Sequence, residues 1–88
     1  MKIQRSGPFR RDFDRLSNPM KRRAEKALRL LIQNLRHPSL EVRIVDHKRR
    51  IWKAKVNGGY RLTFQIEKET ISLRRIGGHG SMERPERW

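Results

Sequence analysis

The chain has 88 residues, enough for one domain, so we expect residues 1–88 to fold as a single unit with a modest core. It carries 23 basic and 9 acidic residues, a formal net charge of +14, and arginine outnumbers lysine 16 to 7. This balance indicates a polyanionic partner, because planar guanidinium groups favour phosphate recognition. Nucleic acid is a better candidate than an anionic membrane, since the sequence has no hydrophobic anchor.

Several classes of protein are excluded by what the sequence lacks. It has no cysteine, so disulfides and thiolate metal sites are ruled out. No run approaches the length of a membrane span, and the first residues lack the apolar stretch of a signal peptide, so we expect a cytoplasmic protein. The carboxylates follow no pattern that would gather metal ligands, and no Walker or Rossmann glycine spacing occurs. We therefore expect neither a metal nor a cofactor.

The first half of the chain predicts a short strand and two helices. Residues 1–5 are typical of a strand, and Gly7-Pro8 opens a helix because proline suits the first helical position. Asn18-Pro19 repeats this signal, with Asn18 expected as the N-cap. We expect the second helix to end at His37-Pro38. Its apolar residues follow the helical spacing on one face: Ala24, Ala27, Leu28, Leu31 and Leu35.

The second half changes to the two-residue period of strands. Residues 40–44 alternate in polarity and predict a strand, which is followed by a basic turn at 46–50. Two further runs, 52–57 and 60–66, flank a pair of glycines, and a last strand is expected at 71–74. We therefore predict an α+β fold, with two N-terminal helices packed on one face of a small antiparallel sheet. The other face would stay partly open and positively charged.

The register of the glycine hairpin decides where its cations lie. A two-residue turn would mix polar and apolar side chains, whereas a three-residue turn at 57–59 puts all apolar side chains on one face. The last strand would place Arg74 opposite Thr63, on the same face as the cations. Arg75 would then point toward the apolar side, so we expect a bulge or a strand end nearby. The expected hairpin pairs are Val56–Tyr60, Lys55–Arg61, Ala54–Leu62, Lys53–Thr63 and Trp52–Phe64.

This clustering of like charges on one sheet face has a chemical meaning. Directly opposed cations destabilise a sheet by a few tenths to about 1 kcal/mol a pair, so such a face usually implies a polyanion that neutralises it. Lys53, Lys55 and Arg61 are therefore candidates for phosphate capture and for stabilising a phosphorane-like transition state. The alternative is an ordinary solvated sheet face. Further candidate RNA contacts are Arg49, Arg50, Arg74 and Trp88, the last of which could equally be a frayed end.

Histidine supplies the proton chemistry that RNA cleavage needs. His79 lies in a glycine-rich stretch, residues 77–80, that we expect to be flexible, and its imidazole can remove a 2′-hydroxyl proton or protonate a leaving oxygen. Beside the cationic face, His79 indicates RNA cleavage rather than RNA binding alone. A lone histidine in such a loop can also be incidental. His37, beside a proline, resembles a cap, and His47 lies in a turn, so both are expected to be structural or solvated.

The segment from Ile51 to Ile66, followed by Arg75 to His79, resembles the RelE/ParE superfamily of bacterial and archaeal toxins. The Gly-Tyr-Arg-Leu core with its upstream Lys-x-Lys looks like the RelE branch. The Ile-Gly-Gly-His end is similar to the YafQ-like branch, where a histidine occupies that place. The likeness extends over nearly the whole chain, and it implies a RelE-like fold and a toxin of a type II toxin-antitoxin system.

The resemblance also implies an activity: metal-independent, ribosome-dependent mRNA cleavage by attack of a 2′-hydroxyl on the adjacent phosphate. Lys53 and Lys55 would bind phosphate or assist proton transfer, Arg61 would stabilise the transition state, and His79 would be the general acid or base. The implied partners are mRNA in the ribosomal A site and an acidic antitoxin that wraps the toxin in a heteromeric complex. The RelE and YafQ-like branches both carry an aromatic residue shortly after the last strand. Residues 81–87 contain no aromatic residue, so Trp88 is the only candidate for this position.

Two alternatives remain open at this point. One is a ParE-like inhibitor of DNA gyrase, which would use the same fold to bind a protein. That branch generally lacks the full lysine–arginine–histidine set, so the residues favour the nuclease. The other is a non-catalytic nucleic-acid-binding module, which the missing aromatic keeps in consideration.

Overall fold

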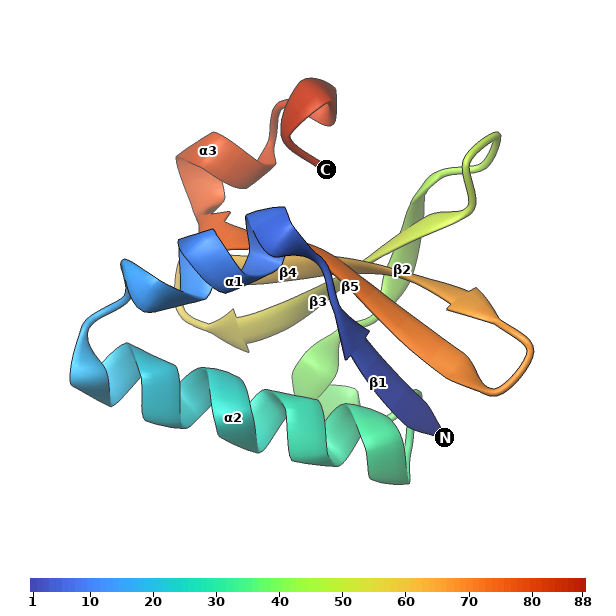
Figure 1. Cartoon of the computed structure of the whole chain (residues 1–88), viewed down its shortest axis with the longest axis horizontal. Helices are drawn as coiled ribbons and strands as arrows, with labels where there is room; N and C mark the ends of the chain where they lie inside the picture. The colour runs from blue at the N-terminus through green and yellow to red at the C-terminus, as the bar shows by residue number, and fades with distance from the viewer.

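A five-stranded sheet forms the centre of the molecule. The computed structural model describes residues 1–88, and the strands lie in the order β1-β5-β4-β3-β2. In Figure 1, α2 runs along one side of the sheet and the C-terminal residues rise on the opposite side. In chain order the elements are β1 (Lys2–Arg5), α1 (Gly7–Asp14), α2 (Asn18–Gln33), the 3₁₀ turn η1 (Pro38–Leu40), β2 (Arg43–Asp46), β3 (Ile51–Asn57), β4 (Tyr60–Glu67), β5 (Thr70–Gly78), α3 (His79–Met82) and η2 (Pro85–Arg87).

Both long helices begin at a serine. The hydroxyls of Ser6 and Ser17 accept the backbone N–H three residues further on, at 3.1 and 3.2 Å, and a proline follows in each first turn. The prediction of Asn18 as N-cap is therefore wrong by one residue. Asn18 is already helical, because the serine before it supplies the capping oxygen.

The second helix is shorter than the sequence predicted. It ends at Gln33 and not at His37-Pro38, because Asn34 adopts an extended backbone with φ −160° and ψ 101°. Its side-chain oxygen accepts the N–H of Arg36 at 3.0 Å, which replaces a helical hydrogen bond. A polar side chain thus stops the helix before proline is reached.

The strand predicted over residues 40–44 is also displaced. Leu40 belongs to η1 and is buried in the core, 2% exposed, while β2 begins only at Arg43. Between them, Glu41 adopts a left-handed backbone with φ 45°, which breaks the extended conformation. The alternating apolar residues therefore reflect burial in two different elements rather than one strand.

The helices and the sheet enclose one apolar core. The predicted apolar stripe of α2 is confirmed except at Leu35, which lies beyond the end of the helix and is only partly buried. Small alanines in that stripe let the helix approach the sheet closely. Complete burial of a large apolar side chain contributes roughly 1.5–3 kcal/mol, so this face supplies most of the stabilisation. The buried cluster comprises Phe9, Ala24, Ala27, Leu28, Leu31, Leu40, Ala54, Leu62, Phe64, Ile71, Leu73 and Ile76.

The α+β class is confirmed, but the sheet is mixed rather than antiparallel. Strand β1 pairs in parallel with β5, with Lys2 beside Thr70 and Arg5 beside Leu73. The other pairs are antiparallel because short turns join them. No such turn constrains β1, whose connection to β5 passes through both helices and three strands.

The β3–β4 hairpin has the predicted face but a different turn. Lys55 lies opposite Arg61 and Lys53 opposite Thr63, as expected. The chain reverses at Gly58-Gly59, where Gly58 takes φ +50°, and a bulge at Val56 then corrects the register. The predicted Val56–Tyr60 pair is therefore wrong: Asn57 pairs with Tyr60 instead. The bulge restores the alignment of apolar side chains that a plain two-residue turn would have destroyed.

A second bulge separates two neighbouring arginines on β5. Thr63 pairs with Arg75 and not with Arg74, so the predicted Arg74–Thr63 pair is wrong. Because of the extra residue, Leu73 and Ile76 both face the core although they are three positions apart. Arg74 donates to Trp88 on the opposite face. The Arg75 guanidinium donates two bonds to Asp12 of α1, at 2.7 and 3.0 Å, and this carboxylate also accepts the N–H of Ile76 at 3.2 Å.

The chain after the last strand is ordered into a compact segment, residues 79–88, which we call the C-terminal segment. Gly77 and Gly78 belong to β5 and His79 begins α3, so the predicted flexible stretch is wrong. Met82 is 2% exposed, and the segment covers part of the sheet face opposite the long helices. The second face is thus partly open and positively charged, as expected, and this segment covers part of it. No helix is long and apolar enough to cross a membrane.

Candidate active site

Cations from three neighbouring strands gather in a small hollow of about 130 Å³, which we call the cationic pocket. Strand pairing produces it, because Arg43 lies beside Lys53 and Lys55 beside Arg61. Glu41 supplies its one carboxylate. Its charged lining residues are Glu41, Arg43, Lys53, Lys55 and Arg61. Three of the four predicted catalytic residues are thus brought together.

Lys53 lies at the buried end of the pocket, with only 7% of the residue exposed. Its ammonium donates to the carbonyl oxygen of Met82 at 3.4 Å and lies 5.7 Å from the centre of the Trp88 ring. Burial lowers the pKa of Lys53 below 10.5, and the charges of Arg43 and Arg61 lower it further. This amine is therefore easier to deprotonate than an ordinary lysine, and it can take part in proton transfer.

Lys55 and Arg61 are both held in place. The Lys55 ammonium lies 3.2 Å from the Glu41 carboxylate at the rim of the pocket. The Arg61 guanidinium turns back along its own hairpin and donates to the carbonyl oxygens of Gly58 and Tyr60, at 2.5 and 2.9 Å. The glycine turn thus positions the guanidinium as well as reversing the chain.

His79 is held beside the same hairpin by the register of β5. Tyr60 pairs with Gly78, so His79 follows directly, and a Cβ added at Gly59 would lie 3.5 Å from the His79 Cβ. Its Nε2 lies 2.7 Å from a carboxylate oxygen of Glu83, one helical turn further on. The imidazole is about half-exposed. It can therefore reach a ligand bound near the hairpin.

The backbone oxygen of Trp88 joins two polar residues of the cationic face. It accepts from Thr63 Oγ1 at 3.1 Å and from Arg74 Nε at 2.8 Å. The indole Nε1 donates to Met82 at 2.7 Å, and Arg74 also donates to Gln65 at 2.9 Å. Trp88 is therefore docked rather than frayed, and it holds the predicted RNA contact Arg74 beneath the C-terminal segment.

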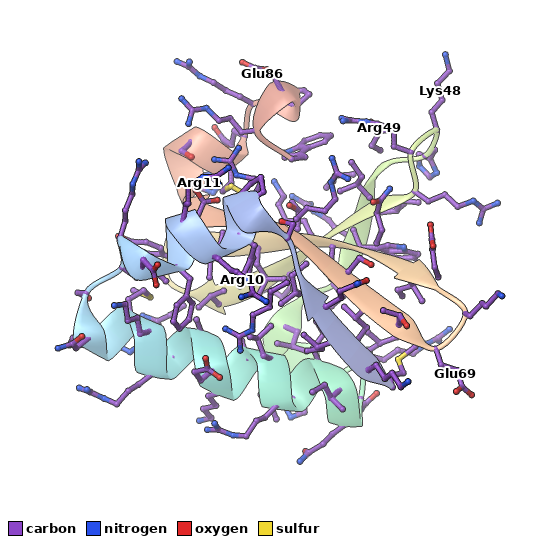
Figure 2. The ribbon with its side chains drawn as sticks, in the orientation of Figure 1. Arg10, Arg11, Lys48, Arg49, Glu69 and Glu86 are labelled. Atoms are coloured by element: carbon purple, nitrogen blue, oxygen red, sulfur yellow. The ribbon has the colours of Figure 1, made fainter.

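The other two predicted RNA contacts lie outside the pocket, in the β2–β3 turn. Arg49 donates to Asp46 at 2.6 and 2.9 Å and turns toward the C-terminal segment, where it reaches the Pro85 carbonyl at 3.4 Å (Figure 2). Those bonds from Arg49 lower the pKa of the Asp46 carboxyl. Arg50 is exposed in a left-handed conformation, and Lys48 points into solvent. This turn is a separate basic surface.

Comparison with known proteins identifies the chain. Residues 3–83 match the family described as the ParE toxin of the type II toxin-antitoxin system, parDE. The chain belongs to this toxin family. The RelE/ParE superfamily inferred from its motifs is thereby confirmed, and the protein is a toxin of toxin-antitoxin type. None of the curated proteins matches the toxin in sequence.

Solved structures share the toxin's fold at low sequence identity. YafQ from E. coli strain BL21(DE3) superposes with a TM-score of 0.76 at 20% identity, covering 92% of this chain and 96% of that one. The YoeB/ParE toxin from Agrobacterium tumefaciens gives 0.76 at 10%, covering 90% and 99%. A chain of the RelB-RelE antitoxin-toxin complex from Methanococcus jannaschii gives 0.72 at 16%, covering 91% and 94%. These similarities establish the expected RelE-like architecture.

Two residues of this site were missed by sequence reasoning. Arg43 enters the cationic pocket through its pairing with Lys53, which no periodicity within its own short strand reveals. Glu83 contacts His79, and its spacing of four residues would have been a signal had the stretch been read as helical. No group of three or more histidines and carboxylates in the toxin could hold a metal ion.

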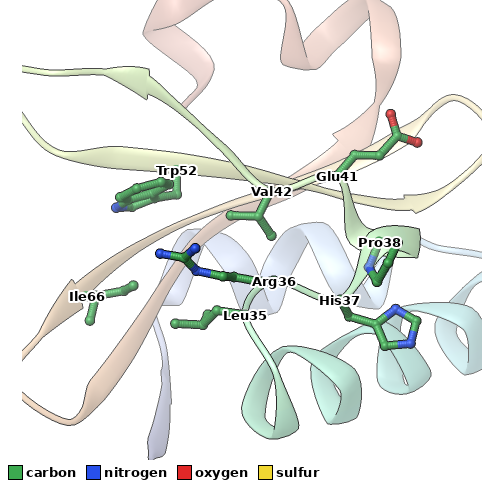
Figure 3. A pocket seen from close by; sticks show the side chains of 8 residues that line it. All are labelled: Leu35, Arg36, His37, Pro38, Glu41, Val42, Trp52 and Ile66. Carbon is green, nitrogen blue, oxygen red and sulfur yellow. The ribbon is translucent and has the colours of Figure 1, made fainter.

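The largest hollow of the toxin lies elsewhere. It measures about 520 Å³, and its apolar lining comes from the α2–β2 connection, from Trp52 of β3 and from Ile66 of β4 (Figure 3). His37 stands at its edge as the N-cap of η1, and its Nδ1 accepts the backbone N–H of Ser39 at 3.2 Å, which confirms its capping role. The titratable groups of the cationic pocket are absent from this hollow except for Glu41.

Proposed function

We propose that the toxin is an mRNA endoribonuclease that cleaves on the ribosome without a metal ion, by attack of a 2′-hydroxyl on the adjacent phosphate. The cationic pocket is the observation that carries this proposal. Cations fixed in advance around developing negative charge are usually the largest single contribution to catalysis. Three strands hold these cations, and rigid elements maintain such geometry better than loops. The ribosome requirement rests on the resemblance to the RelE branch.

The proposed roles follow from position and protonation. Arg61 and Lys55 bind the scissile phosphate, and the charge of Arg61 stabilises the phosphorane-like transition state. His79 takes the proton of the attacking 2′-hydroxyl as the new O2′–P bond forms and the P–O5′ bond breaks. Lys53, with its lowered pKa, returns a proton to the departing 5′ oxygen. The products are a 2′,3′-cyclic phosphate and a 5′-hydroxyl.

The C-terminal segment has a part in substrate binding under this proposal. The Trp88 ring already lies against the Lys53 ammonium, so a base that stacks on it would sit beside the scissile phosphate. Arg74, Arg49 and Arg50 would then contact RNA phosphates on either side. Since Arg74 is bonded to Trp88, its contact requires the segment to shift.

A second candidate function is inhibition of DNA gyrase. The matched family is described as ParE toxins, which supports this second candidate. The cationic pocket with an adjacent imidazole favours the nuclease, since a protein-binding inhibitor does not require groups arranged for proton transfer. The two functions differ in what they stop: translation for the nuclease and DNA replication for the gyrase inhibitor.

The partner of the toxin is an antitoxin, as in the antitoxin-toxin complexes among the similar structures. We infer that this antitoxin is acidic and covers the cationic pocket. The toxin's charge of +14 favours a negatively charged partner, and a covered pocket would exclude RNA.

Arg61→Ala is the variant that tests the proposed function, with Arg29→Ala on the outer face of α2 as a charge-matched control. Each protein is induced in cells, and a translated mRNA is examined by primer extension. We expect codon-spaced cuts with wild type and the control, and about 10²–10³-fold fewer with Arg61→Ala, because one stabilising donor is lost. Growth arrest without cuts, with halted replication, would instead support gyrase inhibition. Harmless wild-type protein would indicate a binding module.

Circular dichroism and thermal unfolding of the purified Arg61→Ala protein complete this test. Arg61 donates to the hairpin turn, so its loss could also loosen the fold. A variant that unfolds like wild type but does not cleave assigns the arginine to the reaction. A variant that does not fold would make Arg61 a structural residue.

A further inference from the structure

Glu83 is the carboxylate nearest the proposed chemistry that has no role so far. Helix α3 places it four residues after His79, so the two side chains share one face, and their Nε2 and Oε1 atoms lie 2.7 Å apart. The preceding residue, Met82, accepts the hydrogen bond of Lys53 through its carbonyl oxygen. Glu83 therefore contacts one of the two groups that handle protons and adjoins the residue that accepts from the other.

A carboxylate in this position constrains the imidazole. A carboxylate only accepts hydrogen bonds, so the bonded Nε2 must carry a proton. In a neutral ring the other nitrogen, Nδ1, is then the free base. The hydrogen bond thus selects both the tautomer and the basic nitrogen.

The charge of Glu83 acts on Lys53 as well. It raises the pKa of that lysine, against the larger lowering by burial and by the charges of Arg43 and Arg61. A single carboxylate is therefore coupled to the proposed base and to the proposed acid. Glu41, the other carboxylate of the site, pairs instead with Lys55.

We propose that Glu83 is a positioning residue for RNA cleavage, which holds the proton of His79 on Nε2 so that Nδ1 receives the proton of the attacking 2′-hydroxyl. The inference rests on the proposed nuclease function. During the reaction the proton moves from O2′ to Nδ1, the O2′–P bond forms and the P–O5′ bond breaks. Glu83 remains ionised and the Nε2 proton stays in place.

An ordinary surface ion pair is the competing explanation. Both side chains are more than half exposed, at 54% and 59%, and such pairs contribute little to stability. A purely surface role predicts no change in the reaction when the carboxylate is removed. The same exposure makes the test clean, because Glu83→Ala should unfold at the temperature of wild type.

The decisive variants are Glu83→Ala, Glu83→Gln and the control Glu86→Ala, which removes the same charge from η2. Cleavage is measured on ribosomes that carry one defined mRNA. We expect kcat to fall about 10–100-fold in Glu83→Ala with KM unchanged, below the roughly 10⁴-fold effect of a fully buried orienting carboxylate. Glu83→Gln should recover part of this loss, because its amide oxygen still accepts from Nε2. Glu86→Ala should match wild type.

A second readout does not depend on activity. Nitrogen-15 spectra of histidine-labelled protein, assigned with His79→Gln, report which ring nitrogen carries the proton above the titration range of the imidazole. We expect the Nε2–H tautomer alone in wild type and a mixture in Glu83→Ala. Equal spectra for these two proteins, or equal kcat values for Glu83→Ala and Glu86→Ala, would overturn the inference. Wild type that leaves mRNA intact while its tautomer is fixed would instead reject the nuclease function, and the catalytic role of Glu83 with it.

Discussion

The two faces of the sheet differ in what holds them together. The face toward α1 and α2 buries a continuous apolar cluster. The opposite face carries the cationic pocket and is covered at one side by the C-terminal segment, largely through hydrogen bonds. The first face supplies stability, while the second gathers like charges that oppose folding. Charges kept together at such a cost are typical of a functional site.

Each face holds one cation that is withdrawn at least partly from solvent, and the two cations have different partners. On the helix side, Arg75 forms a bidentate pair with Asp12, which holds the pKa of the guanidinium above its ordinary value. On the opposite side, Lys53 has a carbonyl oxygen and an aromatic ring as neighbours, and its pKa is lowered. One cation is thus structural and neutralised, whereas the other is left short of negative charge. A bound phosphate would supply the negative charge that Lys53 lacks.

The largest change in stability that we expect comes from removing the carboxylate that pairs with Arg75 on the helix side. Asp12→Ala leaves the Arg75 guanidinium and the Ile76 N–H without their acceptor, and should lower the free energy of unfolding by about 1–3 kcal/mol. Asp14→Ala removes the same charge from an exposed position of α1 and is the matched control. Urea unfolding followed by circular dichroism measures both. Equal losses in the two variants would contradict the contrast between the faces.

Lys53→Met tests the opposite face, and we expect it to raise the free energy of unfolding rather than to lower it. Its lowered pKa means that the folded state binds fewer protons than the unfolded state as pH approaches 10.5 from below. The cost of keeping Lys53 charged is fully present at neutral pH and is relieved as pH rises through the folded-state pKa. We expect Lys53→Met to be more stable at pH 7, by on the order of 1 kcal/mol, and to lose cleavage.

Urea unfolding at two pH values checks that sign. The advantage of Lys53→Met over wild type should shrink between pH 7 and pH 10.5, because wild type alone gains stability from losing the Lys53 proton. Lys48→Met, at the exposed β2–β3 turn, should show no such change. A Lys53→Met protein less stable than wild type at pH 7 would show that the ammonium supports the fold.

Periodicity made one part of this contrast predictable from sequence. The apolar stripe of α2 and the placement of Lys53, Lys55 and Arg61 on one face follow from local repeats and from burial of the opposite side chains. The irregularity of β5 beside Arg75 was expected from sequence, because regular alternation would point this arginine toward the apolar side. Its partner Asp12 was not predictable, because it lies 63 residues away in sequence. The proposed roles of these residues remain predictions.

The C-terminal segment shows most clearly where sequence reasoning ended. Its polar composition resembles that of a solvated tail, and only Met82 marks a buried position. Its polar contacts with the rest of the chain are hydrogen bonds from Thr63, Arg74, Lys53 and Arg49, which follow no repeat. Such docking depends on the finished sheet. From sequence alone, Trp88, which docks over the cationic face, could therefore not be distinguished from a frayed chain end.

The smallest effect concerns Glu41, which competes with phosphate for Lys55. Glu41→Gln removes this exposed pair, so stability should change by less than about 0.5 kcal/mol. Affinity for a short single-stranded RNA should rise two- to threefold. In wild type, RNA binding must first break the Lys55–Glu41 ion pair, which costs up to about 0.5 kcal/mol, and the variant avoids this cost. Glu69→Gln, on the distant β4–β5 turn, adds the same net charge and serves as the control (Figure 2). Equal gains in both variants would mean that RNA responds to net charge rather than to the cationic pocket. A gain confined to Glu41→Gln, measured by fluorescence anisotropy at fixed salt, would locate the phosphate beside Lys55.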